Sequence, residues 1–316
     1  MKKILKISLV IIVALLAMMW YLNSSVDYSP DYLVEKVIKK NYPTLEEHQG
    51  NNPTTQAKFE KYLSKENSSM PKEHLDILEK GENLAADLVL PRSEINRLFD
   101  TGYLASESGY RLNDDGSSYV SALTKMPGVT IEMIDWWFWW HAKEGVRYQI
   151  WYPDMHYDIA ADFQGHYEDS KKSYQERLHM SAHLVNEDIG LGKGNILIDF
   201  MSPAAFGFDE NKLNDEVTII CARAGDPEIG TWATDMCHFV RTTEDGVEMR
   251  SRFWFGQKVR RIGGFGQPFL NTILNQPFVK KKLLPPTFGK ALFHHCSQEF
   301  HNLAEILPQV YQEEAQ

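Results

Sequence analysis

The stretch HFVRTTEDGVEMRSRFWF, residues 238–255, decides the fold. Two runs rich in β-branched and aromatic residues flank Glu244, Asp245 and Gly246. Acidic residues and glycine between two such runs predict a β-hairpin. Two further strands are predicted upstream, because NILIDFM (195–201) and VTIICAR (217–223) are also rich in β-branched residues. We therefore expect a sheet of antiparallel strands in this half of the chain.

The segment that follows the hairpin is predicted to be helical. Residues 290–311 have helical periodicity, and a shorter helix is expected after residue 92, with Ser93 as its N-cap and Gly102 as its end. Strands grouped ahead of one long C-terminal helix predict an α+β domain, in which an antiparallel sheet has helices on one side. A curved sheet wrapped on such a helix leaves a cavity between the two.

Composition limits the possible partners. The chain has 316 residues, a formal net charge of −10 and no long basic run beyond its first residues. Such a balance argues against a surface that tracks phosphates, so nucleic acid is not expected as a partner. We divide the chain into residues 1–24, a polar and partly helical extension at 25–81 without a recognisable site, and a main domain at 82–316.

The first segment has the layout of a membrane-targeting sequence. In MKKILKISLVIIVALLAMMWYLNSS, three lysines precede an apolar run at residues 7–22. The run is slightly short for a spanning helix, no small-x-small cleavage site follows it, and Trp20 and Tyr21 resemble interfacial anchors. We favour an uncleaved anchor over a cleaved signal. Either one predicts a main domain outside the cytoplasm, anchored to the membrane or secreted.

The three cysteines do not indicate a metal site. Cys221, Cys237 and Cys296 are odd in number and lack C-x-x-C spacing. One disulfide is allowed in an oxidising compartment, but three buried thiols that behave as small apolar side chains are the expected arrangement.

Histidine and glutamate four residues apart recur in FHHCSQEFHNLAEILPQVY, residues 293–311. The stripe through His295 and Glu299 continues at steps of three and four to apolar positions, so this pair should lie on the buried face of the helix; these positions are Leu303, Ile306, Leu307 and Val310. The stripe through Gln298, His301 and Glu305 is polar and should face water. A buried carboxylate needs a partner, since its desolvation costs several kcal/mol. Neighbouring protein groups can supply that partner, or the pair can bind a metal such as zinc.

Two other segments bring similar groups into apolar surroundings. PGVTIEMIDWWFWWH (127–141) predicts a helix that begins near Thr130 and ends at His141. HMSAHLVNEDIG (179–190) places His183 and Glu187 four residues apart. Each alone is a weak signal, because a lone apolar-face histidine is usually a satisfied core residue and the acidic turn can lie at the surface. Their convergence with the C-terminal pair predicts a metal site.

Five stretches follow one another between residues 108 and 311: SGYRLNDDGSSYVSALTKMPGVTIEMIDWWFWWH, RYQIWYPDMH, HLVNEDIG, EMRSRFWFG and HHCSQEFHNLAEILPQVY. In this order they resemble the family of phloretin hydrolase and 2,4-diacetylphloroglucinol hydrolase. The resemblance covers residues 82–311. It implies a Bet v 1-like, START-like helix-grip fold and a zinc-dependent hydrolase that cuts the carbon–carbon bond between an acyl group and a phenolic ring.

The resemblance also implies a ligand set of two histidines and two glutamates for the zinc ion. Matched by motif, the histidines fall on His141 and His295 and one glutamate falls on Glu299. The second glutamate matches Glu187. Glu176 is the fallback, because the stretch between residues 156 and 187 is longer than the family's usual spacing.

His238 matches a family histidine expected to assist proton transfer or substrate binding, although a strand histidine bonded to a neighbouring backbone group would look the same. Trp137, Trp140 and Trp254 are the residues expected to bind a flat aromatic or ketonic substrate. Family members hold phenols with tyrosine hydroxyls, and this chain has Phe253 and Trp254 in RSRFWFG; if a tyrosine is usual there, a hydroxyl has been lost. The targeting segment is a further departure, so the identity of the substrate is not carried over. A module that binds a hydrophobic ligand at the membrane without turnover is the alternative function, and a homodimer is kept open.

Overall fold

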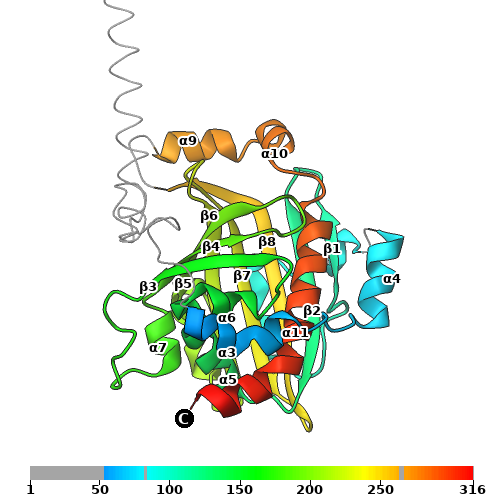
Figure 1. Cartoon of the computed structure of the whole chain (residues 1–316). Coiled ribbons are helices and arrows are strands. Elements are labelled where there is room, and N and C mark those ends of the chain that lie inside the picture. The colour runs from blue at the N-terminus through cyan, green and yellow to red at the C-terminus, as the bar shows by residue number, and fades with distance from the viewer. Residues whose placement is uncertain (1–52, 82–83, 263–266, 316) are drawn as a thin grey trace, which may run out of the picture.

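The computed structural model describes residues 53–81, 84–262 and 267–315. Its centre is one antiparallel sheet of eight strands in the order β1-β2-β8-β7-β6-β5-β4-β3, and the architecture is α+β as predicted (Figure 1). The expectation that helices lie on one side only is wrong, because the helices Arg92–Phe99 and Pro203–Phe206 contribute to a second core on the opposite face. The strands are β1 (Gly109–Leu112), β2 (Ser118–Pro127), β3 (His156–Asp162), β4 (Ala182–Glu187), β5 (Gly194–Met201), β6 (Val217–Asp226), β7 (Thr231–Thr242) and β8 (Gly246–Arg261).

The predicted hairpin is confirmed as β7 and β8, which pair from Thr242 with Val247 to Thr231 with Arg261. The predicted strands at 195–201 and 217–223 are confirmed as β5 and β6. Successive side chains of a strand point to opposite faces. Along β8, Ser251 and Phe253 therefore face one side of the sheet, whereas Arg252 and Trp254 face the other.

Among the described helices, α11 at the C-terminus is the longest, with 27 residues. Thr130 caps the helix of the aromatic stretch, as predicted, and accepts a hydrogen bond from the backbone N–H of Met133 at 3.2 Å. The α-helices are α3 (Pro53–Leu63), α4 (Lys72–Lys80), α5 (Ile131–Trp140), α6 (Gly145–Gln149), α7 (Tyr174–Leu178), α8 (Pro203–Phe206), α9 (Gln267–Leu274), α10 (Pro277–Leu283) and α11 (Phe288–Glu314).

The helix predicted after residue 92 is a 3-10 helix, Arg92–Phe99. It begins after Pro91 rather than after Ser93, which lies inside it. Proline fixes φ near −65° and donates no N–H, so it favours the position at which extended chain becomes helix. Three further 3-10 turns lie at Ala86–Leu88, His141–Lys143 and Glu210–Lys212.

Both faces of the sheet are covered. Helix α11 lies across one face against β1 and β2 (Figure 1), where Phe293, Phe300 and Leu303 join the main hydrophobic core. On the other face, Ile95 and Leu98 of the 3-10 helix pack with strand residues in a second core. The two cores make the sheet the central layer and leave the α11 side for a cavity.

Residues 53–81 belong to the same body. Phe59, Tyr62 and Ile77 are buried in the main core. The predicted boundary between an extension and a domain at residues 81 and 82 therefore does not coincide with an edge of the core. Burial of these side chains removes apolar surface from water, which holds α3 and α4 against the domain.

The same part of the chain corrects the expectation that one stripe of the last helix faces water. The Gln298 amide donates to the Ser68 carbonyl at 2.6 Å, and the ring of His301 lies edge-on to that of His74. Gln298 is only 8% exposed. Periodicity within α11 could not reveal this cover, because the covering residues lie more than 200 positions earlier in the sequence.

The predicted targeting segment, residues 1–24, lies outside the described residues. Within the described ranges, none of the helices combines the length and apolar character that crossing a bilayer requires. Cys221, Cys237 and Cys296 are buried free thiols, as expected. Cys221 and Cys237 are opposite one another on β6 and β7 but form no disulfide.

Candidate metal centre and active site

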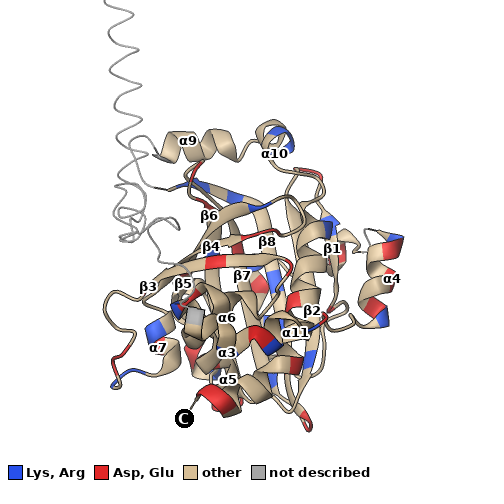
Figure 2. Ribbon diagram, viewed as in Figure 1, with Lys and Arg blue, Asp and Glu red and all other residues tan. Residues whose placement is uncertain are grey.

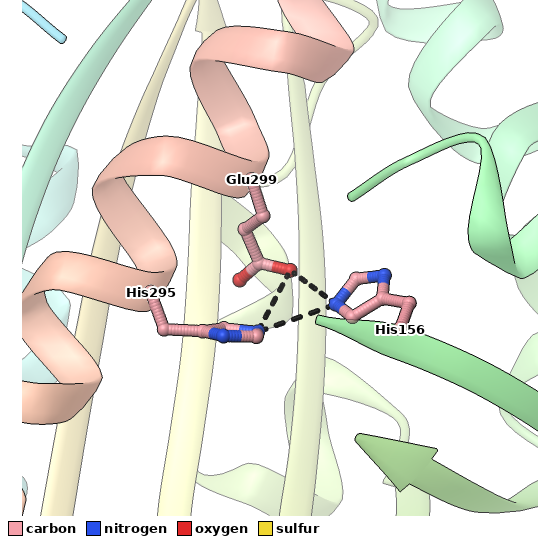
Figure 3. A group of neighbouring side chains, drawn as sticks. All are labelled: His156, His295 and Glu299. Atoms are coloured by element: carbon pink, nitrogen blue, oxygen red, sulfur yellow. Dashed lines mark hydrogen bonds and ion pairs between the residues drawn. The ribbon is translucent and has the colours of Figure 1, made fainter. Parts of the chain in front are cut away.

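Three buried side chains converge beside α11, and Figure 3 shows their polar atoms pointing at one another. The Nε2 atoms of His156 and His295 are 3.2 Å apart. Glu299 Oε2 lies 3.6 Å from Nε2 of His156 and 3.8 Å from Nε2 of His295. Two nitrogens and one oxygen so close together could hold a metal ion.

Helical and strand geometry supply these groups from two directions. His295 and Glu299 lie one turn apart on the face of α11 that continues into buried Leu303. His156 is the first residue of β3, and its ring stacks on that of Tyr148 with centroids 4.0 Å apart. Nδ1 of His156 lies 3.3 Å from the Tyr148 carbonyl. Because a carbonyl only accepts, Nδ1 carries the proton and Nε2 presents its lone pair to the cluster.

Glu187 completes the cluster from the neighbouring strand. It is paired with His156 in the β3–β4 register, and its Oε2 lies 3.6 Å from Nε2 of His156. The Tyr148 hydroxyl donates a hydrogen bond to the same carboxylate. The segment is the strand β4. Residues four apart on a strand share a face, so His183 and Glu187 both reach the cavity.

The buried charges of the cluster lack a compensating cation. Burial raises the pKa of Glu187 to about 7, although the bond from Tyr148 lowers it, and burial together with Glu187 raises that of Glu299 well above its usual value. Burial lowers the pKa of His295 to about 4 and holds the pKa of His156 well below its usual value. Among the described residues that line the cavity there is no lysine or arginine. A divalent ion would supply the missing positive charge, so these residues fit a metal of the kind bound by nitrogen and oxygen.

A cavity of about 480 Å³ adjoins the cluster. His295, Glu299 and Glu187 line it, together with His141, His183 and His238. The rest of the wall is mainly apolar. Its aromatic members are Tyr148, Trp151, Phe138, Phe200, Phe253, Phe255, Phe288 and Phe300. A large apolar pocket with a few convergent polar groups is typical of a small-molecule site.

His238 faces this cavity from β7. Its Nδ1 lies 2.8 Å from the Ser251 hydroxyl on β8. Phe138, Phe253 and Phe300 surround the ring. Burial lowers the pKa of His238 to about 3, so the imidazole is neutral at neutral pH. A neutral imidazole held by one nitrogen can exchange a proton through the other.

Of the four predicted ligands, the structure brings three together. His295 and Glu299 belong to the convergent group, and Glu187 lies beside it. His141 lines the cavity but lies outside the group: it follows α5, and its Nδ1 lies 2.7 Å from the Trp137 carbonyl. The fallback residue Glu176 is exposed, because its carboxylate caps the start of α7 in a capping box with Ser173.

The three predicted substrate-binding tryptophans are buried away from the cavity wall. Trp137 and Trp140 pack inside the main core, and Trp254 lies on the opposite face of the sheet, where its indole donates to the Leu90 carbonyl at 2.8 Å. Alternation along β8 gives the wall Phe253 instead of Trp254. In the aromatic stretch the wall residue is Phe138.

Sequence reasoning did not assign a role to His156 or Tyr148. Both occur in RYQIWYPDMH, which was quoted only as part of a motif. The alternating pattern HYDIAAD after Pro153 is typical of a strand that begins at the histidine. That signal could have placed His156 at a strand end, but not opposite α11.

Comparison with known proteins identifies the family of this chain. The profile of the DAPG hydrolase PhiG domain family matches residues 90–312. Phloretin hydrolase from Eubacterium ramulus is 33% identical over 264 residues, which cover 81% of this chain and 90% of the relative. The 2,4-diacetylphloroglucinol hydrolase of Pseudomonas protegens is 29% identical over 244 residues, 75% of this chain and 78% of the relative. The predicted resemblance is confirmed, and the chain belongs to the DAPG hydrolase family of hydrolytic enzymes.

Proposed function

We propose that this protein is a zinc-dependent hydrolase that cleaves the carbon–carbon bond between an acyl group and a phenolic ring. The main observation in support is that His156, Glu187, His295 and Glu299 cluster at the wall of an apolar cavity. The substrate class is suggested by relatives named for phloretin and 2,4-diacetylphloroglucinol. These four residues are the proposed ligands, with His156 in the role first expected of His141.

The reaction adds one water across the bond. The acyl carbon receives the hydroxyl and leaves as a carboxylic acid, and the ring carbon receives a proton in place of the acyl group. A bound zinc ion supplies Lewis acidity, which lowers the pKa of water or polarises a carbonyl oxygen. The cavity contributes exclusion of bulk water and a flat apolar wall for the ring.

The protein groups near the cluster have two roles: one orients a proposed ligand, and another transfers protons. We assign proton transfer to and from the substrate to His238, because Ser251 holds one ring nitrogen and leaves Nε2 as the exchanging atom. Tyr148 keeps its hydroxyl proton, because burial and the neighbouring Glu187 raise the pKa of the phenol well above its usual value. That hydroxyl orients the Glu187 carboxylate by donating to it.

Metal analysis and turnover test the proposal together. Purified full chain should contain about one zinc per chain by elemental analysis and release a carboxylic acid and a deacylated phenol from phloretin or diacetylphloroglucinol. Chelation should abolish release, and added zinc should restore it. Folded protein that binds these phenols without turning them over, with or without zinc, would instead support the alternative of a ligand-binding module.

Three further proposals concern the whole chain. We propose that residues 1–24 hold the protein at a membrane with the described domain outside the cytoplasm, that the fold is of the Bet v 1-like helix-grip type, and that the chain can form a homodimer. Protease added to intact cells should digest the domain if it lies outside. Superposition on helix-grip structures and light scattering of the purified protein test the other two.

A further inference from the structure

Exposed apolar side chains gather at one end of the molecule. Among the described residues, five of the nine large apolar side chains that face solvent lie on α9, α10 and the turn between them. They are Phe269, Leu270, Ile273, Phe278 and Leu283, and Phe278 is 73% exposed. Figure 1 shows α9 and α10 side by side across the end of the sheet. Exposed large apolar side chains gathered on two neighbouring helices are typical of an interaction surface.

Hydrogen bonds explain why α9 points this patch outward. Asn271 accepts from the backbone N–H of Arg261 at 2.7 Å, and Asn275 both accepts from and donates to the backbone of Val259. These two amides therefore tie one side of α9 to β8. Phe269 and Ile273 lie two positions away from them, about 200° around the helix, and so face solvent.

The charge of this segment is opposite to that of the protein. Residues 267–288 contain three lysines and no aspartate or glutamate, although the whole chain has a net charge of −10. Figure 2 shows α9 without charged residues and basic residues on α10. Lys280 is buried and pairs with Asp115 at 2.7 Å, whereas Lys281 and Lys282 are exposed.

The mouth of the catalytic cavity opens within the same patch. Leu283 of α10 is 60% exposed and also lines the cavity. Leu191 and Ile229, from the turns after β4 and β6, are likewise both exposed and part of the cavity wall. Leu274 continues the wall from α9. An apolar molecule could thus pass from the patch to the buried cluster along apolar side chains.

We propose that the α9–α10 surface docks on a lipid bilayer that carries anionic headgroups, with the cavity mouth facing the lipid. The apolar side chains enter the interface, while Lys281 and Lys282 meet the headgroups. A second copy of the chain fits less well, because a twofold contact through this face would bring the same lysines toward each other. The cavity then receives apolar ligands that partition into the membrane. This docking does not depend on the reaction that follows.

A fluorescent label distinguishes docking through this surface from attachment by any other part of the chain. In the full chain, Phe278→Cys is labelled with a thiol-reactive NBD dye, and Leu75→Cys on α4 is the matched control. Leu75 is also exposed, at 49%, and the native cysteines are buried, so both sites label selectively. Each protein is mixed with vesicles of phosphatidylcholine alone or with phosphatidylglycerol added.

With phosphatidylglycerol vesicles, the dye at position 278 should become brighter, shift to the blue and be quenched by spin-labelled lipid, and the dye at position 75 should not. Adding Lys281→Glu and Lys282→Glu should weaken this response at least about tenfold in lipid concentration. Three outcomes would overturn the proposal: no response at position 278, equal responses at both positions, or a response that rises with protein concentration without lipid. The last would identify a second copy as the occupant.

Discussion

Two buried clusters of charge lie on opposite faces of the sheet, and they differ in how their carboxylates are compensated. Outside the cavity, Glu107 receives Arg250 at 2.6 Å on one oxygen and Arg252 on the other. Burial raises the pKa of Glu107, but the two guanidinium groups outweigh it and keep the pKa below its usual value. Inside the cavity, Glu187 and Glu299 have histidines and a tyrosine as neighbours and keep raised pKa values.

The difference distinguishes a cluster that stabilises the fold from one that could bind a metal ion. In the arginine cluster, both guanidinium groups have the Glu107 carboxylate as a partner of opposite sign. In the function proposed above, a bound cation supplies the positive charge that the cavity cluster lacks. Both depend on β8, where Arg252 serves the first and Ser251, which bonds His238, serves the second.

Removing a ligand from the cavity cluster should have the largest effect. His295→Ala should reduce bound zinc from about one per chain to a trace and lower kcat/KM on the order of 1000-fold. Elemental analysis and steady-state assays with phloretin measure the two. The far-ultraviolet circular dichroism should stay unchanged, because the variant removes an uncompensated polar group rather than a core contact. Full zinc content in this variant would contradict the ligand assignment.

Breaking the arginine cluster should instead destabilise the fold. Glu107→Gln leaves Arg250 and Arg252 buried without their carboxylate, which should cost about 3–5 kcal/mol in the free energy of unfolding. Urea denaturation followed by circular dichroism measures it. Zinc content per folded chain should stay near that of the parent. If Glu107→Gln lost zinc but kept its stability, Glu107 would belong to the metal site rather than to a structural cluster.

The effect of Glu187→Gln on the free energy of unfolding should depend on metal and on pH, and at pH 8 zinc should reverse its sign. In metal-free protein, the raised pKa of Glu187 contributes stability below about pH 4.5 that is lost as pH rises through about 7. Glutamine removes this dependence, so at pH 8 with chelator the variant should be more stable than the parent by about 3 kcal/mol, and equal to it at pH 4.

With zinc present at pH 8, the order should reverse, because an amide is the poorer ligand. Denaturant titrations with chelator and with zinc at both pH values give the four comparisons. Equal stability of the two proteins in metal-free buffer at pH 8 would show that the Glu187 carboxylate is compensated by the protein alone.

The smallest effect is expected from an exposed ion pair between α11 and the chain segment that covers it. Glu305 contacts Lys65 at 2.5 Å, but both side chains are more than 40% exposed. Glu305→Gln should therefore change the free energy of unfolding by less than about 1 kcal/mol and leave zinc content unchanged. Thermal unfolding beside the Glu107→Gln variant measures the contrast. A loss as large as that of Glu107→Gln would mean that exposure does not separate the two kinds of pair.

Local sequence patterns predicted helices and strands correctly where the hydrophobic periodicity and the cap or turn residues indicated the same element. The hairpin, β5, β6, the Thr130 cap and the C-terminal helix follow from residues close together in the sequence. The i,i+4 spacing of His183 and Glu187 was ambiguous, because it places two side chains on one face in a helix and in a strand alike. The tryptophans were misleading for another reason: bulk and apolarity favour burial but do not specify which side of a layer a ring enters.

The sequence by itself determined that His295 and Glu299 share the buried face of a helix, because an α-helix repeats every 3.6 residues. Only the tertiary structure decided that His156, 139 positions away from His295, rather than His141, meets this pair. It also decided that residues 53–81 complete the core. Such pairings depend on sheet order and on the docking of α11, which join distant segments, and local periodicity carries no information about them.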